Sequence, residues 1–306
     1  MIDKKGIKKS IHGRLKNWAK KNNESVENTL YRYTIERLLY RLSQSKYKNQ
    51  FLLKGAFLFT LWFDAPHRTT RDVDFLNTGT NDIKELERIF KDVCIVKVVE
   101  DGLTFEPETI RVEPIMEESF YGGIRVRMLA ILDKARMLLQ IDIGCGDAVT
   151  PAPIQSKLPT ILKMPAPRLR TYPIYTVIAE KLETMILRGL GNSRMKDIYD
   201  IWFLSKKLKL EGKALLAAVI NTFKRRKTPF PSNKPLVLSQ EFYLNPEKQI
   251  QWNAFLKRNK FTSDEIRLEP IISSLNDFLD APLTAASLGR SFSKTWSNKK
   301  GWHEVL

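Results

Sequence analysis

Hydrophobic and polar positions follow two different periods along the chain. Between residues 94 and 145, short apolar runs predict β-strands, namely CIVKVVE, LTFEP, TIRVEPI, GIRVRMLAIL and ARMLLQIDIG. A connector with five prolines before residue 170, TPAPIQSKLPTILKMPAPRLRTYP, follows, and beyond it the period is mostly helical apart from a break at KTPFPSNKP. The pattern therefore predicts an α+β protein, with a mixed β-sheet flanked by helices and a mainly helical C-terminal half.

Three segments that precede these strands predict helices. SVENTLYRYTIERLLYRL has a helical apolar stripe with Ser25 as its N-cap, and TNDIKELERIFKDV is amphipathic and capped by Thr80 or Asn81. FLLKGAFLFTLWF, residues 51–63, is almost wholly apolar and predicts a buried helix opened by a tight turn near Gly55. We expect a basic helical segment at 1–45, a core domain at 46–165 and a helical domain at 166–306 that completes the active site.

The stretch RTTRDVDFL places two carboxylates inside a strand-like run. Asp72 and Asp74 alternate with apolar residues, so both point to one face of the strand, roughly 6–7 Å apart. Paired carboxylates repel one another, and Mg²⁺ relieves this repulsion because it binds one or two carboxylates together with substrate phosphates. The alternatives are a solvated edge strand or an ion pair with Arg68 or Arg71.

Two other positions extend this candidate site. Gly55, in LLKGAF, predicts a turn that can bring backbone N–H groups close to a triphosphate. Asp142, in RMLLQIDIGCGD, alternates with two isoleucines and so projects from a strand face. It is a third candidate metal ligand, or else an ordinary residue near the end of a strand.

A second cluster is predicted by the helical period of YPIYTVIAEKLETMILRGL. Lys181 falls in the middle of the apolar stripe of this helix, and Arg188 falls close to it, whereas Glu180 and Glu183 point away. Cations on a buried face are costly unless they are paired or face a ligand. Long side chains near a helix end can also extend to water, which would explain Arg188 but explains Lys181 poorly.

The next helix offers partners for these cations. In SRMKDIYDIWFLSK, Asp197 and Asp200 share the inward face with apolar residues. One interpretation is a structural ion-pair network. The other is a phosphate-binding Lys181 that an aspartate orients, because perturbed charges concentrate at functional sites.

Charge narrows the class of partner. The 306 residues include 51 Lys and Arg against 34 Asp and Glu, a net charge of +17. Residues 1–22 and 206–227 each hold eight basic residues against one acidic residue, which favours contacts with nucleic-acid phosphates over a role in solubility alone. With two cysteines, no apolar run of 18 residues and no apolar N-terminal stretch, we expect a cytoplasmic protein without a disulfide framework or a membrane contact.

Two blocks of the sequence resemble a known family. KGAFLFTLWFDAPHRTTRDVDF and IAEKLETMILRGLGNSRMKDIYDIWFL resemble the signature blocks of the AbiEii/AbiGii (MenT-like) nucleotidyltransferase toxins, in the DNA polymerase β-like superfamily. The resemblance covers roughly residues 35–205 and implies a polymerase β-like core. It departs from the family pattern at Ala56, where a second glycine is usual, and at Lys196, where the family has arginine.

The resemblance also implies roles for individual residues. Asp72, Asp74, Lys181 and Asp197 would be catalytic, and Mg²⁺ (or Mn²⁺) would bind Asp72 and Asp74. The strand and helix patterns described above add Asp142 as a further candidate metal ligand and Asp200 as a supporting residue. The nucleotide-binding residues would be Lys54, Gly55, Ala56, Arg71, Lys181 and Arg188.

The expected reaction is the transfer of a nucleotide from an NTP to RNA. The resemblance implies a tRNA 3′ end as the acceptor, growth inhibition as the outcome and a cognate antitoxin as the protein partner. Two alternatives remain: a nucleotidyltransferase that modifies a small molecule such as an antibiotic, and an RNA-binding protein without catalytic activity.

Overall fold

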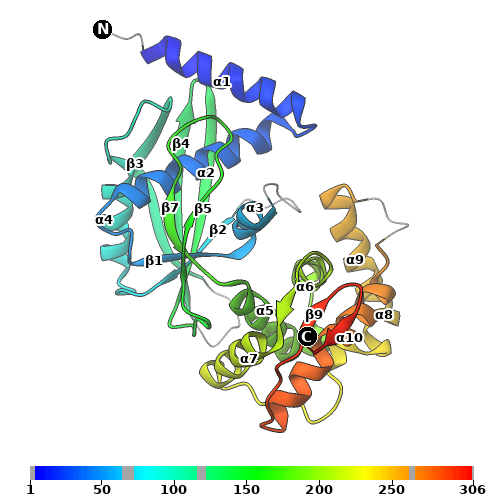
Figure 1. The fold of residues 1–306 in the computed structure, drawn as a ribbon. Coiled ribbons are helices and arrows are strands. Elements are labelled where there is room, and N and C mark those ends of the chain that lie inside the picture. The colour runs from blue at the N-terminus through cyan, green and yellow to red at the C-terminus, as the bar shows by residue number, and fades with distance from the viewer. Residues whose placement is uncertain (1–3, 64–71, 116–121, 262–265, 305–306) are drawn as a thin grey trace. The chain divides into compact units, whose positions relative to one another are not determined.

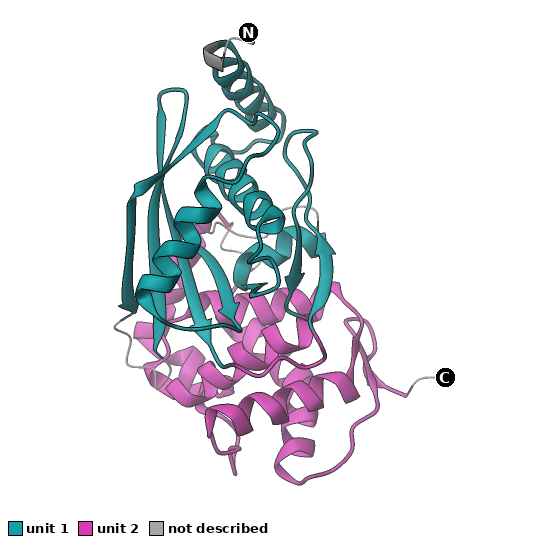
Figure 2. Ribbon diagram, turned by 90° about the vertical axis from the view of Figure 1, so that its left-hand side faces the viewer, with its two compact units in different colours: residues 1–146, 153–172 teal, residues 147–152, 173–306 magenta. Residues whose placement is uncertain are grey.

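The computed structural model describes residues 4–63, 72–115, 122–261 and 266–304 (Figure 1). The chain divides into two compact units: unit 1 is Met1–Gly146 with Pro153–Tyr172, and unit 2 is Asp147–Ala152 with Pro173–Leu306 (Figure 2). The expected limits at residues 45 and 165 both fall inside unit 1.

Unit 1 is built on a mixed sheet of seven strands in the order β3-β4-β5-β2-β1-β7-β6. Strand β2 is parallel to β5, β1 is parallel to β7, and the other neighbours are antiparallel. This confirms the expected mixed sheet. The strands are β1 (Phe51–Lys54), β2 (Asp72–Asn77), β3 (Leu103–Ile115), β4 (Gly123–Leu132), β5 (Ala135–Cys145), β6 (Ile154–Lys157) and β7 (Arg168–Thr171).

The helices of unit 1 are α1 (Lys4–Lys21), α2 (Val26–Gln44), α3 (Leu58–Phe63) and α4 (Ile83–Cys94). Ser25 caps α2 as predicted, since its side chain accepts a hydrogen bond from the N–H of Asn28. The cap of α4 is Asp82, which accepts from the N–H of Glu85, so the prediction of Thr80 or Asn81 was wrong.

Two further expectations for unit 1 were wrong. Residues 51–63 are buried over most of their length, but they form strand β1, a 3₁₀ turn at Gly55–Phe57 and only then the short helix α3. The apolar run CIVKVVE completes α4 and continues as a loop, in which the side chain of Ile95 is 69% exposed. The strand prediction for LTFEP and TIRVEPI is confirmed, although both belong to the single strand β3, which has an irregularity between Glu106 and Arg111.

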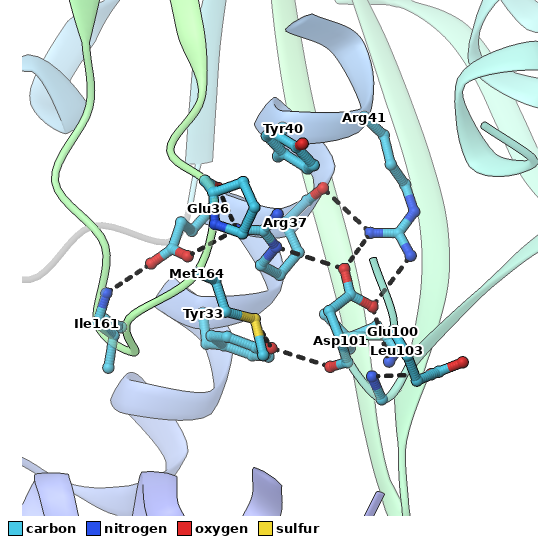
Figure 3. Close-up of polar contacts among 12 residues, drawn as sticks. Tyr33, Glu36, Arg37, Tyr40, Arg41, Glu100, Asp101, Leu103, Ile161 and Met164 are labelled. Atoms are coloured by element: carbon cyan, nitrogen blue, oxygen red, sulfur yellow. Dashed lines mark hydrogen bonds and ion pairs between the residues drawn. The ribbon is translucent and has the colours of Figure 1, made fainter. Parts of the chain in front are cut away.

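A buried polar network connects α2 to two loops of unit 1 (Figure 3). Arg41 donates two hydrogen bonds to the carboxylate of Asp101, which also accepts one from Arg37. Glu36 is paired with Arg37 at 3.2 Å and accepts a hydrogen bond from the N–H of Ile161. Each charged side chain of this network thus has a partner of opposite charge, as burial requires.

Unit 2 is mainly helical, as expected. Its helices are α5 (Ile174–Arg188), α6 (Met195–Lys207), α7 (Gly212–Arg226), α8 (Gln240–Leu244), α9 (Pro246–Asn259) and α10 (Leu268–Ser287), and a small antiparallel sheet joins β8 (Leu210–Glu211), β9 (Thr295–Ser297) and β10 (Gly301–His303). Its core contains the fully buried side chains of Leu182, Ile198, Leu215 and Phe278. No helix in the described part of the chain is long and apolar enough to cross a membrane.

Candidate active site

The carboxylates of the first cluster belong to the interior of the sheet. Asp72 and Asp74 are half-buried on β2, alternating with Val73 and Phe75, which are each 1% exposed. The alternation places both aspartates on one face of the strand. Strand β2 is paired with β5 on one side and β1 on the other, so the alternative of an edge strand is excluded.

The backbone at Gly55 lies directly against the carboxylate of Asp74. Gly55 has a φ of +74°, and a Cβ atom at this position would lie 1.9 Å from Oδ2 of Asp74. Only glycine permits both this left-handed conformation and this approach. The neighbours of Gly55 lie next to Asp74 in the fold. Lys54 is the register partner of Asp74, and its Nζ lies 5.3 Å from the ring centroid of Tyr172, while Ala56 is buried.

Asp142 lies beside these aspartates, and an arginine holds it there. Its Cα is the register partner of Asp74 on the parallel strand β5. Arg125 of β4 donates two hydrogen bonds of 2.8 Å, one to each oxygen of Asp142. The pKa of Arg125 is raised, mainly by these hydrogen bonds and also by the negative charge of Asp72. Arg71 and Arg68 lie outside the described residues.

The second cluster lies within unit 2, where α5 and α6 face one another. Lys181 of α5 places its Nζ 2.5 Å from Oδ1 of Asp197 and 2.8 Å from Oδ2 of Asp200, both on α6. The two carboxylates are 1% and 0% exposed, whereas the side chain of Lys181 is 13% exposed. Arg194, just before α6, donates to the other oxygen of Asp197 at 2.6 Å.

These contacts fix the charge of Asp197. Burial would raise the pKa of its carboxyl, but the positive charges of Lys181 and Arg194 outweigh burial and hold that pKa well below its usual range. Asp197 is therefore ionised at neutral pH, and two cations compensate its charge. Arg194 was not predicted, although its position three residues before Asp197 is the spacing at which helical residues meet.

Two other residues of α5 differ from the helical-wheel prediction. Arg188 is half-buried and forms no ion pair with Asp197 or Asp200 within the described residues. Glu183 was predicted to point away, yet its side chain is 2% exposed and lies 2.7 Å from Arg226 of α7. Arg226 also contacts Asp147 at 3.2 Å, so this member of the basic segment 206–227 is an internal ion-pair residue.

The donor set of unit 1 suits a hard divalent cation. Asp72 and Asp74 supply carboxylate oxygens from one strand face, and Mg²⁺ in proteins commonly takes one or two carboxylates and completes its coordination with phosphates and water. The described residues contain no group of three or more His, Cys, Asp or Glu side chains arranged to hold a metal ion. A metal ion at Asp142 would have to compete with Arg125.

Comparison with known proteins identifies the family. The sequence model of the nucleotidyl transferase AbiEii toxin family, of type IV toxin–antitoxin systems, matches residues 37–281, which is most of the chain. The protein belongs to the AbiEii family. The match extends past the resemblance at residues 35–205 and into α10, and the chain is thus a nucleotidyltransferase of a toxin family.

Solved structures and curated proteins add little to this AbiEii assignment. The chain is 16% identical to JHP933 from Helicobacter pylori, covering 83% of this chain and 89% of that one with a TM-score of 0.43. It is 14% identical to a candidate nucleotidyltransferase from H. pylori, covering 88% of this chain and 100% of that one with a TM-score of 0.45. No curated protein matches the chain.

Proposed function

We propose that this AbiEii protein is a metal-dependent enzyme that transfers a nucleoside monophosphate from an NTP to the 3′ end of an RNA. The observation that carries the proposal is the approach of the Gly55 backbone to Asp74, beside a second aspartate on the same strand face. A carboxylate pair next to a glycine turn is suited to hold a triphosphate close to a divalent cation.

In this proposal the 3′ hydroxyl of the acceptor attacks the α-phosphorus. The hydroxyl loses its proton to water as a new P–O bond forms. The bond from the α-phosphorus to the oxygen that bridges it to the β-phosphorus breaks, and pyrophosphate leaves with the electron pair of that bond. Mg²⁺ (or Mn²⁺), when bound, would neutralise charge on the phosphates. Asp72 and Asp74 would hold it, with Asp142 as a further ligand if Arg125 yields, while Lys54, Gly55, Ala56 and Arg71 would position the nucleotide.

The charged cluster on α5 and α6 has the second role. We propose that Lys181 donates to the phosphates of the nucleotide and that Asp197 and Asp200, which both contact its ammonium group, hold it in place. The support is that Lys181 retains 13% exposure while both of its carboxylate partners are buried. Preorganised charges of this kind stabilise developing negative charge most effectively. Arg188, at the end of α5, would assist.

The acceptor and the protein partner follow from charge and family. A net charge of +17 favours a polyanionic acceptor such as tRNA over a small molecule, because a small acceptor has too few phosphates to use it. The type IV toxin–antitoxin description of the AbiEii family favours a cognate antitoxin and action inside the cell. An enzyme that modifies a small molecule would use the same aspartate pair. The salt dependence of acceptor binding distinguishes the two, because only an RNA acceptor should bind with a steep dependence on salt.

The direct test is transfer of labelled NTP to total RNA with Mg²⁺. Asp72→Asn and Asp74→Asn should each reduce transfer by at least about a hundredfold, as should a chelator, while the melting temperature in metal-free buffer stays constant or rises. Asp277→Asn, an exposed aspartate on α10, is the matched control and should transfer normally. Transfer that survives both substitutions on β2 would rule out the metal site.

A further inference from the structure

A separate polar cavity lies in unit 1 at the end of β1 remote from Gly55. It has a volume of about 480 Å³ and is lined by Ser43, Gln44, Lys48, Asn49, Gln155 and Arg168. Asn49 precedes β1 and Gly55 follows it, so the strand separates the cavity from the candidate active site by about 10 Å or more. Small-molecule sites in proteins commonly measure about 300–1,000 Å³, so a nucleotide-sized ligand fits.

The walls of this cavity are fixed by the backbone. The turn between α2 and β1 is closed by hydrogen bonds from the N–H of Lys48 to the carbonyl of Ser45 and from the N–H of Gln50 to that of Tyr47. Arg170 donates to the carbonyl of Asn49 at 3.0 Å, which ties the turn to β7. The backbone that carries Lys48 and Asn49 is therefore held in place, and the exposed side chains of the lining are the parts that can adjust.

The two cations of the cavity have no acidic partner. Within the described residues, neither Lys48 nor Arg168 forms an ion pair, and no carboxylate lines the cavity. Both side chains are exposed, whereas the half-buried Arg127 of the same unit is paired with Glu113 at 2.5 Å. Two unpaired cations around one cavity provide a site for an anion, and a guanidinium beside an ammonium matches a phosphate group well.

The remaining lining side chains indicate what accompanies the phosphate. Asn49 and Gln155 carry amides, each with a donor and an acceptor, and Gln44 carries a third. The Gln44 amide already donates to the Ser43 hydroxyl at 3.2 Å, and that hydroxyl donates to the carbonyl of Tyr40. Side-chain amides form paired hydrogen bonds with base edges, notably with adenine. We propose that this cavity binds a nucleotide, with its phosphate on Lys48 and Arg168 and its base on the amides. This goes beyond the transfer reaction and does not require it.

The nucleotide could be free or part of an RNA strand, and one set of titrations separates the two. Binding of AMP and of a short single-stranded RNA is measured by calorimetry in chelator, which removes metal-dependent binding at β2. Lys48→Ala/Arg168→Ala removes both charge-assisted contacts and should weaken AMP binding by at least about tenfold, which the loss of one such contact alone would cause. Gln155→Leu should weaken it less. Lys97→Ala, an exposed lysine outside the cavity, is the control.

Each outcome decides the proposal. If the double variant binds both AMP and the RNA more weakly than the wild type, the cavity binds a nucleotide within RNA. If only its affinity for AMP falls, the cavity binds a free nucleotide. If the double variant binds both ligands like the wild type, or no more weakly than Lys97→Ala, the proposal is overturned. Transfer by Asp74→Asn is measured separately, so failure of the catalytic proposal remains distinguishable from failure of this one.

Discussion

At the scale of single residues, Gly55 tests the candidate active site most directly. Gly55→Ala would force a side chain into the left-handed region and push its Cβ onto Asp74. We expect a loss of about 1–3 kcal/mol in the free energy of unfolding, from the backbone strain alone, and at least a tenfold loss of transfer per folded molecule. Urea unfolding and initial rates measure the two effects.

Gly191→Ala is the matched control for this substitution. Its Cβ would meet no atom within 4 Å and its φ is not left-handed, so both stability and transfer should stay close to wild type. Full transfer by Gly55→Ala would mean that the approach to Asp74 is structural and has no part in the reaction.

Lys181 is the second residue whose role can be separated from its packing. From the helical wheel alone, Lys181→Met should leave the fold as stable as before or slightly more so. Its contacts with two buried carboxylates reverse that expectation, because removing one partner of a buried ion pair typically costs about 3–5 kcal/mol. If the lysine also meets phosphate, transfer per folded molecule should fall by orders of magnitude.

Asp197→Asn distinguishes the two roles of Lys181. The amide keeps the shape and one acceptor but loses the charge, so transfer should fall less than in Lys181→Met. Thermal melts and initial rates on both variants decide the matter. Activity that falls only in proportion to the unfolded fraction would make the cluster a structural ion-pair network.

At the scale of elements, α2 carries a titratable group buried among ion pairs (Figure 3). Burial raises the pKa of Glu36 from 4.5 to about 7, although the N–H of Ile161 and the charge of Arg37 act in the opposite direction. The folded state therefore binds this proton more tightly than the unfolded state. Stability should fall as the pH rises from about 4.5 to about 7, by up to about 3 kcal/mol from this group.

Glu36→Gln should remove that pH dependence, because a glutamine can still accept from Ile161 but does not titrate. The measurement is the free energy of unfolding in urea at pH 5 and pH 7.5 for both proteins. The wild type should lose more stability between these values than the variant does. Glu85→Gln on α4, whose side chain is 32% exposed and whose pKa is lowered by its hydrogen bonds with Arg88, is the control. Equal pH slopes in all three proteins would contradict the assignment.

The elements also show where hydrophobic periodicity predicts structure and where it fails. The stripes of α2, α4 and α5 were predicted because each helix has one polar and one apolar face. Residues 51–63 were predicted wrongly because β1 is covered on both faces, and a continuous apolar run has no period that distinguishes a strand from a helix.

At the scale of the whole molecule, the unknown register between elements limited the prediction of charged pairs. Lys181, Asp197 and Asp200 were paired correctly from two neighbouring helices of known period. The pairs Arg125–Asp142 and Arg226–Glu183 join residues 17 and 43 positions apart, on strands or helices whose register only the fold determines. A charge pattern alone therefore overstated the number of basic residues available to RNA.

Several other basic residues remain on the surface, and α1 presents the clearest set. One face of this helix is buried through the side chains of Ile11, Leu15 and Ala19. No residue of the helix is acidic. Lys9, Lys16 and Lys20 are exposed, and the helical period places them on a common face. We expect this face to contact phosphates of the acceptor.

Salt dependence tests this expectation and also distinguishes an RNA acceptor from a small one. Each phosphate interaction that a substitution removes should flatten the plot of log affinity against log salt by about 0.7–0.9 units, so the triple alanine variant of Lys9, Lys16 and Lys20 should flatten it by about 2–3 units. The KM for NTP should hardly change, because these lysines are expected to contact phosphates of the acceptor and not the NTP. The control carries the same change in charge at three exposed lysines elsewhere in unit 1, Lys97, Lys134 and Lys163. If both triple variants flatten the slope equally, α1 contributes only net charge, and if neither does, the basic face has no part in binding RNA.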